Sequence, residues 1–316
     1  MPFVEVKNLI KQYQGSDINA VDDISFDIFE GEVFSLLGPN GAGKTTTISI
    51  LNTLIGATSG SAQIDGFDVE KDQMAVRKMI GVVPQELALY DELSGEENLR
   101  FWGEMQGIAP AELKAEIQEK LALMELEDRA RDRVKTYSGG MKRRLNLAVG
   151  LLGNPKLIML DEPTVAIDPQ SRRYILDWVK KINGEGATIL YTTHYMEEAQ
   201  ELSHRIGIMD HGKLIAIGTL DELTRLVGET ETLKLKLAQE LGREQLVEAI
   251  GALPGVSQVT SQQDEVILNV GSSVTEILPK VLNKAAELDI GVRTIDIQEP
   301  NLEAVFLALT GRALRD

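Results

Sequence analysis

Residues 33–46 of this 316-residue chain read Val-Phe-Ser-Leu-Leu-Gly-Pro-Asn-Gly-Ala-Gly-Lys-Thr-Thr. The apolar run at 33–37 predicts a buried strand, and residues 45–54 are compatible with a helix. Between them, residues 38–45 match the G-x-x-x-x-G-K-[ST] pattern of a phosphate-binding loop. Its glycines let backbone N–H groups converge on phosphate oxygens, and the helix N-terminus adds its positive end. The alternative is a glycine turn that merely joins a strand to a helix, and it leaves the lysine and threonine unexplained.

This loop predicts ATP and Mg²⁺ as ligands. Lys44 is expected to reach the β- and γ-phosphates, and the Thr45 hydroxyl is expected to bind Mg²⁺. The residues that we expect to contact the nucleotide here are Asn40, Gly41, Ala42, Gly43, Lys44, Thr45 and Thr46.

A second chemical signal follows an apolar strand later in the chain. Residues 157–162 read Leu-Ile-Met-Leu-Asp-Glu, so Asp161 and Glu162 emerge at the strand's carboxyl end, where open α/β sheets bind ligands. Asp161 fits a Walker-B aspartate that supports Mg²⁺ directly or through a water. Glu162 is then placed to orient or deprotonate the attacking water. The alternative is a pair of surface acids at a strand end, which the upstream phosphate loop makes the minor interpretation.

The arrangement of apolar runs predicts two domains, 1–226 and 232–316. Up to about residue 217, buried strands at 33–37, 156–160, 187–191 and 205–209 alternate with helical patterns, which is typical of an α/β sheet. Residues 86–151 are mostly helical, and a capping-box pattern starts one helix at Ser94. After a linker at 228–231, the order β-α-β-β-α-β predicts a small ferredoxin-like α+β domain, closed by a helix at 301–310.

Composition limits the kinds of partner. The formal charge of −17 argues against nucleic-acid binding through a broad basic surface. The chain has no cysteine, which excludes disulfides and thiolate chemistry. No secretory signal begins it, and no stretch approaches the ~20 apolar residues of a membrane-spanning helix. We therefore expect a soluble cytoplasmic protein whose link to a membrane comes through another chain.

Taken together, these motifs strongly resemble the ABC transporter ATPase family over roughly residues 3–217. Residues 137–141, Tyr-Ser-Gly-Gly-Met, look like its signature motif just before the Walker-B strand. Gln85 looks like the Q-loop glutamine, Asp168 the D-loop aspartate and His194 the switch histidine. The order and spacing of six such elements are far more specific than any one of them. Tyr137, Met141 and Val165 depart from the usual Leu, Gln and Ser at their positions.

The resemblance implies a head-to-tail pair of nucleotide domains with two ATPs between them. Ser138, Gly139 and Gly140 would bind the γ-phosphate of the ATP held by the opposite protomer, at a helix start that offers N–H donors. His194 would contact the γ-phosphate and hold the geometry of the attacking water. Gln85 would sense Mg²⁺ or water near the contact with a membrane subunit.

Asp168, at the D-loop position, joins the expected nucleotide contacts. So does Tyr13, which matches the position of an aromatic that stacks on adenine, although an aromatic there could instead be core. We expect a homodimer, because both halves of a composite site are present in one chain.

The C-terminal extension resembles that of daunorubicin-resistance-type exporter ATPases. The likeness lies in residues 299–307, Glu-Pro-Asn-Leu-Glu-Ala-Val-Phe-Leu, in 310–312, and in the 137–144 region. It implies ATP-powered export through a separate membrane-spanning subunit, from the cytoplasmic face of the membrane. The extension itself has no catalytic constellation, so we expect an interaction or dimer-stabilising role for it.

Two other functions compete. One is a soluble ABC ATPase acting on the ribosome or DNA, which the single nucleotide domain and the acidic balance disfavour. The other is a P-loop kinase, which the signature motif argues against.

Overall fold

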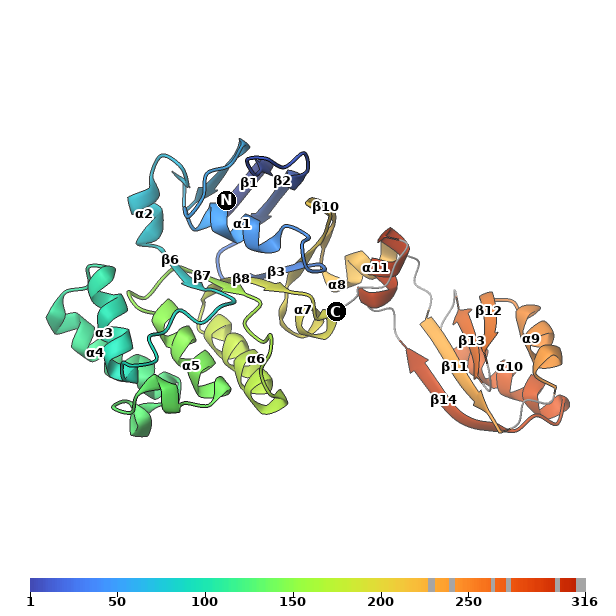
Figure 1. Ribbon diagram of the computed structural model, residues 1–316. Helices are drawn as coiled ribbons and strands as arrows, with labels where there is room; N and C mark the ends of the chain where they lie inside the picture. The colour runs from blue at the N-terminus through green and yellow to red at the C-terminus, as the bar shows by residue number, and fades with distance from the viewer. Residues whose placement is uncertain (227–230, 239–241, 263–264, 271–273, 299–301, 311–316) are drawn as a thin grey trace. The chain divides into compact units, whose positions relative to one another are not determined.

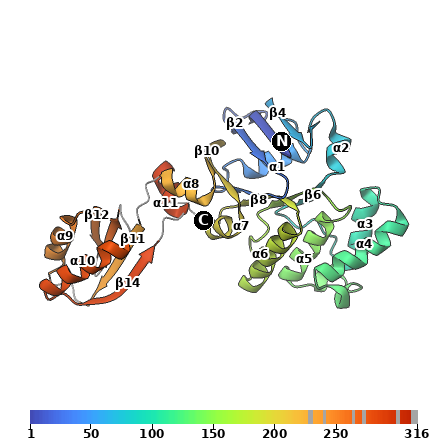
Figure 2. The same cartoon turned by 180° about the vertical axis from the view of Figure 1, so that it is seen from behind.

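The computed structural model describes residues 1–226, 231–238, 242–262, 265–270, 274–298 and 302–310, and Figures 1 and 2 show it from two sides. The chain forms two compact units, of which the first spans Met1–Thr219 and the second begins at Leu220. The second unit starts earlier than the predicted boundary at 226–232. The reason is helix α8 (Leu220–Leu226), which packs against α11 (Leu302–Thr310) near the other end of the same unit.

The first unit contains ten strands and seven α-helices. The strands are β1 (Val4–Gln12), β2 (Asn19–Ile28), β3 (Val33–Leu37), β4 (Ser59–Ile64), β5 (Phe67–Asp68), β6 (Ile80–Val83), β7 (Leu157–Asp161), β8 (Thr188–Thr193), β9 (Arg205–Asp210) and β10 (Lys213–Gly218). The helices are α1 (Lys44–Leu51), α2 (Gln73–Arg77), α3 (Gly95–Met105), α4 (Pro110–Leu123), α5 (Gly139–Gly150), α6 (Pro169–Gly184) and α7 (Met196–Leu202). Two short 3₁₀ turns lie at Glu127–Arg129 and Val134–Thr136.

A six-stranded sheet in the order β10-β9-β3-β8-β7-β6 forms the centre of this unit. Its strands pair in parallel except for β10, which runs antiparallel to β9 at the edge. The four strands predicted from apolar runs are β3, β7, β8 and β9. Every residue of β3 and β7 is buried, as expected for parallel strands that are covered on both faces. The predicted α/β class is confirmed.

The two faces of this sheet belong to two separate apolar cores, and β7 shows the division. Leu157 and Met159 pack with α1 and with the four-stranded antiparallel sheet β2-β1-β4-β5. Ile158 and Leu160 point to the other core, which α3, α4, α5 and α6 fill. The alternation follows from the two-residue period of a strand. Figure 1 shows the two layers on opposite sides of the central strands.

Helices α3, α4 and α5 lie within the segment predicted to be helical, 86–151. Helix α3 begins at the predicted capping box: Ser94 Oγ accepts from the Glu97 N–H at 3.2 Å, and the Ser94 N–H donates to Glu97 Oε2 at 2.7 Å. The carboxylate thus satisfies a helix-end donor, which holds the pKa of Glu97 below its ordinary value.

The second unit has the predicted order β-α-β-β-α-β. Its sheet runs β12-β13-β11-β14, and every pair in it is antiparallel. Leucines at alternate positions of β11 are buried against α9 and α10 in a core made of apolar side chains. Its elements are β11 (Glu231–Leu237), α9 (Arg243–Gly251), β12 (Val256–Gln262), β13 (Glu265–Val270), α10 (Val274–Glu287), β14 (Val292–Gln298) and the α8 and α11 helices.

Some predictions for this unit lie outside the described residues. They are most of the linker, at 228–230, and the motif residues 299–301 and 311–312. In the part of the chain that the structure describes, no helix is both long and apolar enough to cross a membrane.

Candidate active site

The loop between β3 and α1 surrounds a pocket of about 390 Å³. Nine of the ten residues that line it are sequence-predicted site residues; the tenth is Ala20. The full lining is Ala20, Asn40, Gly41, Ala42, Gly43, Lys44, Thr45, Thr46, Gln85 and Glu162. The fold therefore brings the phosphate loop together with one carboxylate and one amide from distant parts of the chain.

Gly43 explains why the loop needs glycine. Its φ is 103°, in the left-handed region, and a Cβ there would lie 2.4 Å from the Ala20 carbonyl oxygen. Gly43 is also the N-cap of α1, and no side chain within the described residues caps that helix. The first N–H groups of α1 are therefore open to an anion.

Adjacent strands of the sheet bring the charged groups of the site to one edge. Strand β8 lies between β3 and β7, so the parallel carboxyl ends carry Lys44, Glu162 and His194 to the same place. Lys44 Nζ lies 3.0 Å from Glu162 Oε1 and donates to the carbonyl oxygens of Gly38 and Pro39 at 2.6 and 3.0 Å. His194 Nδ1 lies 3.1 Å from Glu162 Oε2. Glu162 therefore joins the lysine to the histidine.

Asp161 contacts the phosphate loop through Thr45. Its Oδ1 accepts from the hydroxyls of Thr192, at 2.6 Å, and Thr45, at 3.3 Å. Burial raises the pKa of Asp161, and these two hydrogen bonds partly offset the rise. A hydroxyl and a carboxylate at hydrogen-bonding distance suit Mg²⁺, which uses one or two protein carboxylates and completes its shell with phosphates and water.

Sequence reasoning did not single out Thr192, which positions both acids. Besides its bond to Asp161, Thr192 accepts hydrogen bonds from the Glu162 N–H. Its Oγ1 accepts at 3.0 Å and its carbonyl oxygen at 3.2 Å. Glu162 has a φ of 44°, an unfavourable value for a non-glycine residue that these two bonds help to hold. The available signal was a threonine in the buried strand β8, which pairs with β7 directly opposite Asp161.

Gln85 is held by α5, the helix that begins at the predicted signature motif. Arg143 is buried and donates to the carbonyl oxygens of Pro84, at 3.1 Å, and Gln85, at 2.8 Å. Asn146 Oδ1 accepts from the Ala88 N–H at 3.0 Å. Arg143 belongs to the 137–144 resemblance, but the contact that either Arg143 or Asn146 makes with the Gln85 segment was not predicted, because the sequence alone does not show that the two segments meet.

Tyr13 lies at the rim of the phosphate loop. Its hydroxyl is 3.3 Å from Thr46 Oγ1, and its side chain is 45% exposed. Tyr13 is therefore not a core residue, which was the alternative interpretation, and its role in stacking on adenine stays a prediction.

Ser138, Gly139, Gly140 and Asp168 do not line the pocket, but they lie near one another. Ser138 is the N-cap of α5 and accepts from the Met141 N–H at 3.2 Å. Asp168 is the N-cap of α6 and accepts from the Ser171 N–H at 2.9 Å. A Cβ on Gly140 would lie 2.0 Å from Ser171 Oγ, so the two helix starts are in close contact.

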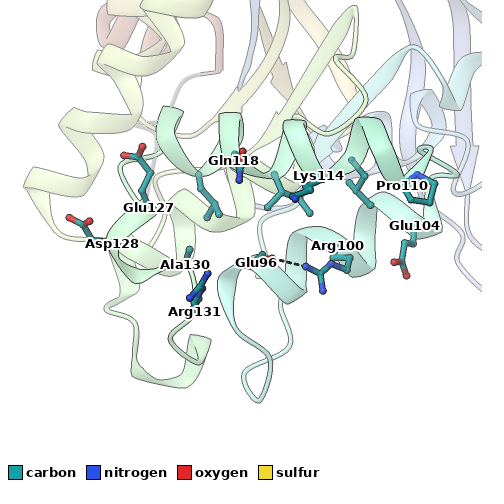
Figure 3. Close-up of a pocket in the computed structure, with 13 residues that line it drawn as sticks. Glu96, Arg100, Glu104, Pro110, Lys114, Gln118, Glu127, Asp128, Ala130 and Arg131 are labelled. Carbon is teal, nitrogen blue, oxygen red and sulfur yellow. Dashed lines mark hydrogen bonds and ion pairs between the residues drawn. The ribbon is translucent and has the colours of Figure 1, made fainter.

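A larger hollow of about 960 Å³ lies between α3 and α4, away from all of these residues. Figure 3 shows its charged rim, in which Glu96 and Arg100 form an ion pair. None of the predicted site residues lines it.

Comparison with known proteins gives a consistent set of relatives. The ABC transporter family model matches residues 21–165. The linearmycin resistance ATP-binding protein LnrL of Bacillus subtilis (strain 168) is 44% identical, covering 99% of this chain and 100% of that protein. The daunorubicin/doxorubicin resistance ATP-binding protein DrrA of Streptomyces peucetius is 37% identical, covering 99% and 94%.

Solved structures match about 70% of the chain. An ATP-binding subunit of an ABC transporter superposes with a TM-score of 0.64 at 31% identity, covering 71% of this chain and 92% of that one. A dimeric, post-hydrolysis form of the ATP-binding cassette MJ0796, bound to ADP and Pi, gives a TM-score of 0.62 at 29% identity, covering 68% and 98%.

Proposed function

The chain belongs to the ABC transporter ATP-binding proteins, of the daunorubicin-resistance type, and we propose that it powers export through a separate membrane-spanning subunit. As a member of this family it binds and hydrolyses ATP. We further propose that two copies work head to tail, at the cytoplasmic face of the membrane, with two ATPs between them.

One observation carries the paired arrangement. The predicted site residues fall into two groups: Lys44, Gln85 and Glu162 line the nucleotide pocket, whereas Ser138 and Asp168 lie elsewhere. Ser138 is exposed at a helix start, and a helix start is suited to bind a phosphate. A second copy can supply that start to the first copy's pocket, and the dimeric form of MJ0796 supports such a pair.

Hydrolysis would use Glu162 as the group that orients or deprotonates the attacking water. A bound γ-phosphate would compete with Glu162 for Lys44, whose ammonium is 3.0 Å from the carboxylate. That exchange frees Oε1 of Glu162 for the water, while His194 holds Oε2 from 3.1 Å away. His194 and Lys44 would then stabilise the charge that develops on the γ-phosphate.

Thr45, Asp161 and Gln85 are the residues that would hold Mg²⁺. The Thr45 hydroxyl and the Asp161 carboxylate are already in contact, and Gln85 lines the same pocket. The bound metal would supply charge neutralisation on the β- and γ-phosphate oxygens.

An exposed apolar patch beside Gln85 supports a contact with a membrane subunit. Leu87 and Tyr90, which follow Gln85 closely in the chain, are 40% and 46% exposed. Phe101 and Trp102 pack against Tyr90, and the Trp102 indole N–H donates to the Ala88 carbonyl at 2.9 Å. An exposed apolar patch whose side chains pack on aromatic rings is suited to bind a protein partner. Its place in the Gln85 segment would let the partner's movement reach the nucleotide pocket.

Export is supported by the names of the relatives, which describe resistance to linearmycin and to daunorubicin or doxorubicin. The alternative of a soluble ABC ATPase acting on the ribosome or DNA has no support among the relatives reported above. Membership of this family also argues against the P-loop kinase alternative, because ABC transporter ATP-binding proteins hydrolyse ATP.

An affinity purification from membranes tests the proposal. The Glu162→Gln variant of the full chain is the bait, and ATP and Mg²⁺ are present to favour the ATP-bound pair of chains. We expect a multi-spanning membrane protein in the eluate, and we expect its loss when the bait also carries Leu87→Ser and Tyr90→Ser. Recovery of only ribosomal or DNA-associated proteins would instead favour the soluble alternative.

A further inference from the structure

The carboxylate of Glu198, on α7, is buried behind the active site and accepts four side-chain hydrogen bonds. Its exposed fraction is 0%. Oε1 accepts from Thr164 Oγ1 and Arg172 Nε, both at 2.7 Å. Oε2 accepts from the Tyr191 hydroxyl and Thr193 Oγ1, both at 2.8 Å. A buried carboxylate persists only where donors and a cation satisfy it. Glu198 meets that condition, because both of its oxygens accept from donors and Arg172 supplies the cation at Oε1.

These donors come from segments that carry the candidate site residues. Thr164 lies three residues after the end of β7, Thr193 is the last residue of β8, and Arg172 lies in the first turn of α6. The pairs of donor and neighbouring site residue are Thr164 with Glu162, Thr193 with His194, and Arg172 with Asp168.

A series of side-chain contacts connects the same arginine to His194. The Arg172 guanidinium carbon lies 4.3 Å from the centre of the Tyr195 ring, and that centre lies 4.1 Å from the centre of the His194 ring. The Tyr195 N–H donates to Thr193 Oγ1 at 2.9 Å, so the tyrosine is tied to the Glu198 cluster as well. Moving Arg172 would therefore disturb both the carboxylate and the imidazole.

The hydrogen-bond directions in this cluster are fixed by its chemistry. Burial, and then the neighbouring Glu198 carboxylate, raise the pKa of Tyr191 well above its ordinary value, so the phenol keeps its proton. The two threonine hydroxyls and the guanidinium can donate as well. A network in which each member has its partner defines one arrangement of the elements that it joins.

We propose that Glu198 is a positioning residue for ATP hydrolysis: together with Arg172 it couples the Asp168 segment to the placement of His194 beside Glu162. Glu198 does not line the nucleotide pocket, so it acts through other residues. The inference rests on the proposed roles of Glu162 and His194. Since Asp168 belongs to the face proposed to meet the second copy, the coupling would let the arrival of that copy set the geometry for hydrolysis.

The test compares Glu198→Ala and Glu198→Gln in the full chain, with Glu197→Ala as the matched control. Glu197 is the exposed neighbour on the same turn of α7. We expect Glu198→Ala to lower kcat about tenfold or more while the ATP affinity stays within about twofold, because the pocket lining is untouched. Glu198→Gln should recover part of kcat, since hydroxyl groups can accept from its amide. Glu197→Ala should match the wild type.

A double variant separates positioning from general support of the fold. If Glu198 acts through His194, then His194→Ala/Glu198→Ala should turn over within about twofold of His194→Ala alone. Multiplied losses would overturn the coupling to His194. An unchanged kcat in Glu198→Ala, or ATP affinity falling in parallel with kcat, would overturn the positioning role. If Glu198→Ala does not fold, the same comparisons are made with the shape-preserving Glu198→Gln, for which we expect a loss of about threefold.

The single variant His194→Ala keeps the two levels of the account apart. Unchanged turnover in that variant would remove His194 from the proposed mechanism, whatever Glu198→Ala does. A large loss in His194→Ala together with unchanged turnover in Glu198→Ala would leave that mechanism in place and remove only the role of Glu198.

Discussion

Two helices of the first unit begin in glycine-containing motifs, and their surroundings differ. The start of α1 lies in a pocket with Lys44, Gln85 and Glu162. The start of α5 is exposed at Ser138 and Gly139, and it borders the start of α6. Both starts offer N–H groups to an anion, and that of α1 shares its pocket with the lysine and carboxylate that phosphate chemistry requires. In the pair proposed above, these two helix starts would be unequal parts of one site that a second copy completes.

The largest effect is expected at the α1 side. Glu162→Gln should lower kcat by about 10²–10³-fold, within the range for removal of a general base, while ATP still binds. The amide keeps the shape of the side chain but cannot take a proton. Steady-state turnover and equilibrium ATP binding check this, and size measurement should show an ATP-dependent dimer. Turnover within twofold of the wild type would show that Glu162 is not the general base. It would also remove the catalytic difference between the α1 and α5 helix starts.

A pair of serine substitutions sharpens the comparison, because Ser94 and Ser138 are both helix N-caps. Ser94 is buried and its bond is returned by Glu97, so Ser94→Ala should cost about 1 kcal/mol of unfolding free energy with little change in turnover. Ser138 is exposed, and Met141 cannot return its bond, so Ser138→Ala should reduce turnover about tenfold and destabilise less. Denaturant unfolding and ATPase assays on both variants decide. If the two variants lose the same stability and keep the same turnover, the start of α5 has no role in ATP hydrolysis.

The contribution of Glu97 to the Ser94 cap should depend on pH. Hydrogen bonds from Ser94 hold the pKa of Glu97 below its ordinary value, so the carboxylate stabilises the fold above that ordinary value. This stability is lost as the pH falls through the lowered pKa. The difference in unfolding free energy between the wild type and Glu97→Gln should therefore be present at neutral pH and vanish in acid. A difference that persists unchanged at low pH would exclude this contribution.

The smallest effect is expected at Tyr13, on the rim of the α1 side. Loss of a stacked aromatic ring is worth about 0.5–1.5 kcal/mol, so Tyr13→Ala should weaken ATP binding by roughly two- to tenfold. Tyr13→Phe keeps the ring and should bind like the wild type. Equal losses in both variants would assign the effect to the hydroxyl near Thr46 and not to stacking.

Local motifs could be predicted from the sequence, whereas contacts between distant segments could not. The phosphate loop, the acids after β7 and the capping box at Ser94 are each specified by a few consecutive residues. Thr192, Arg143 and Glu198 each make a hydrogen bond to a residue about thirty to sixty positions away. The early start of the second unit was missed for the same reason, since α8 packs against a helix about eighty residues later.

A mixing experiment tests the paired site most directly. Lys44→Ala should disable the α1 side and Ser138→Arg the α5 side, so each variant alone should be nearly inactive. In a mixed pair one site would receive both defects and the other would be intact, so an equimolar mixture should recover up to about a quarter of the wild-type rate if sites act independently. A mixture no faster than the average of its two components would contradict the account, because the two helix starts would not then be combining between chains.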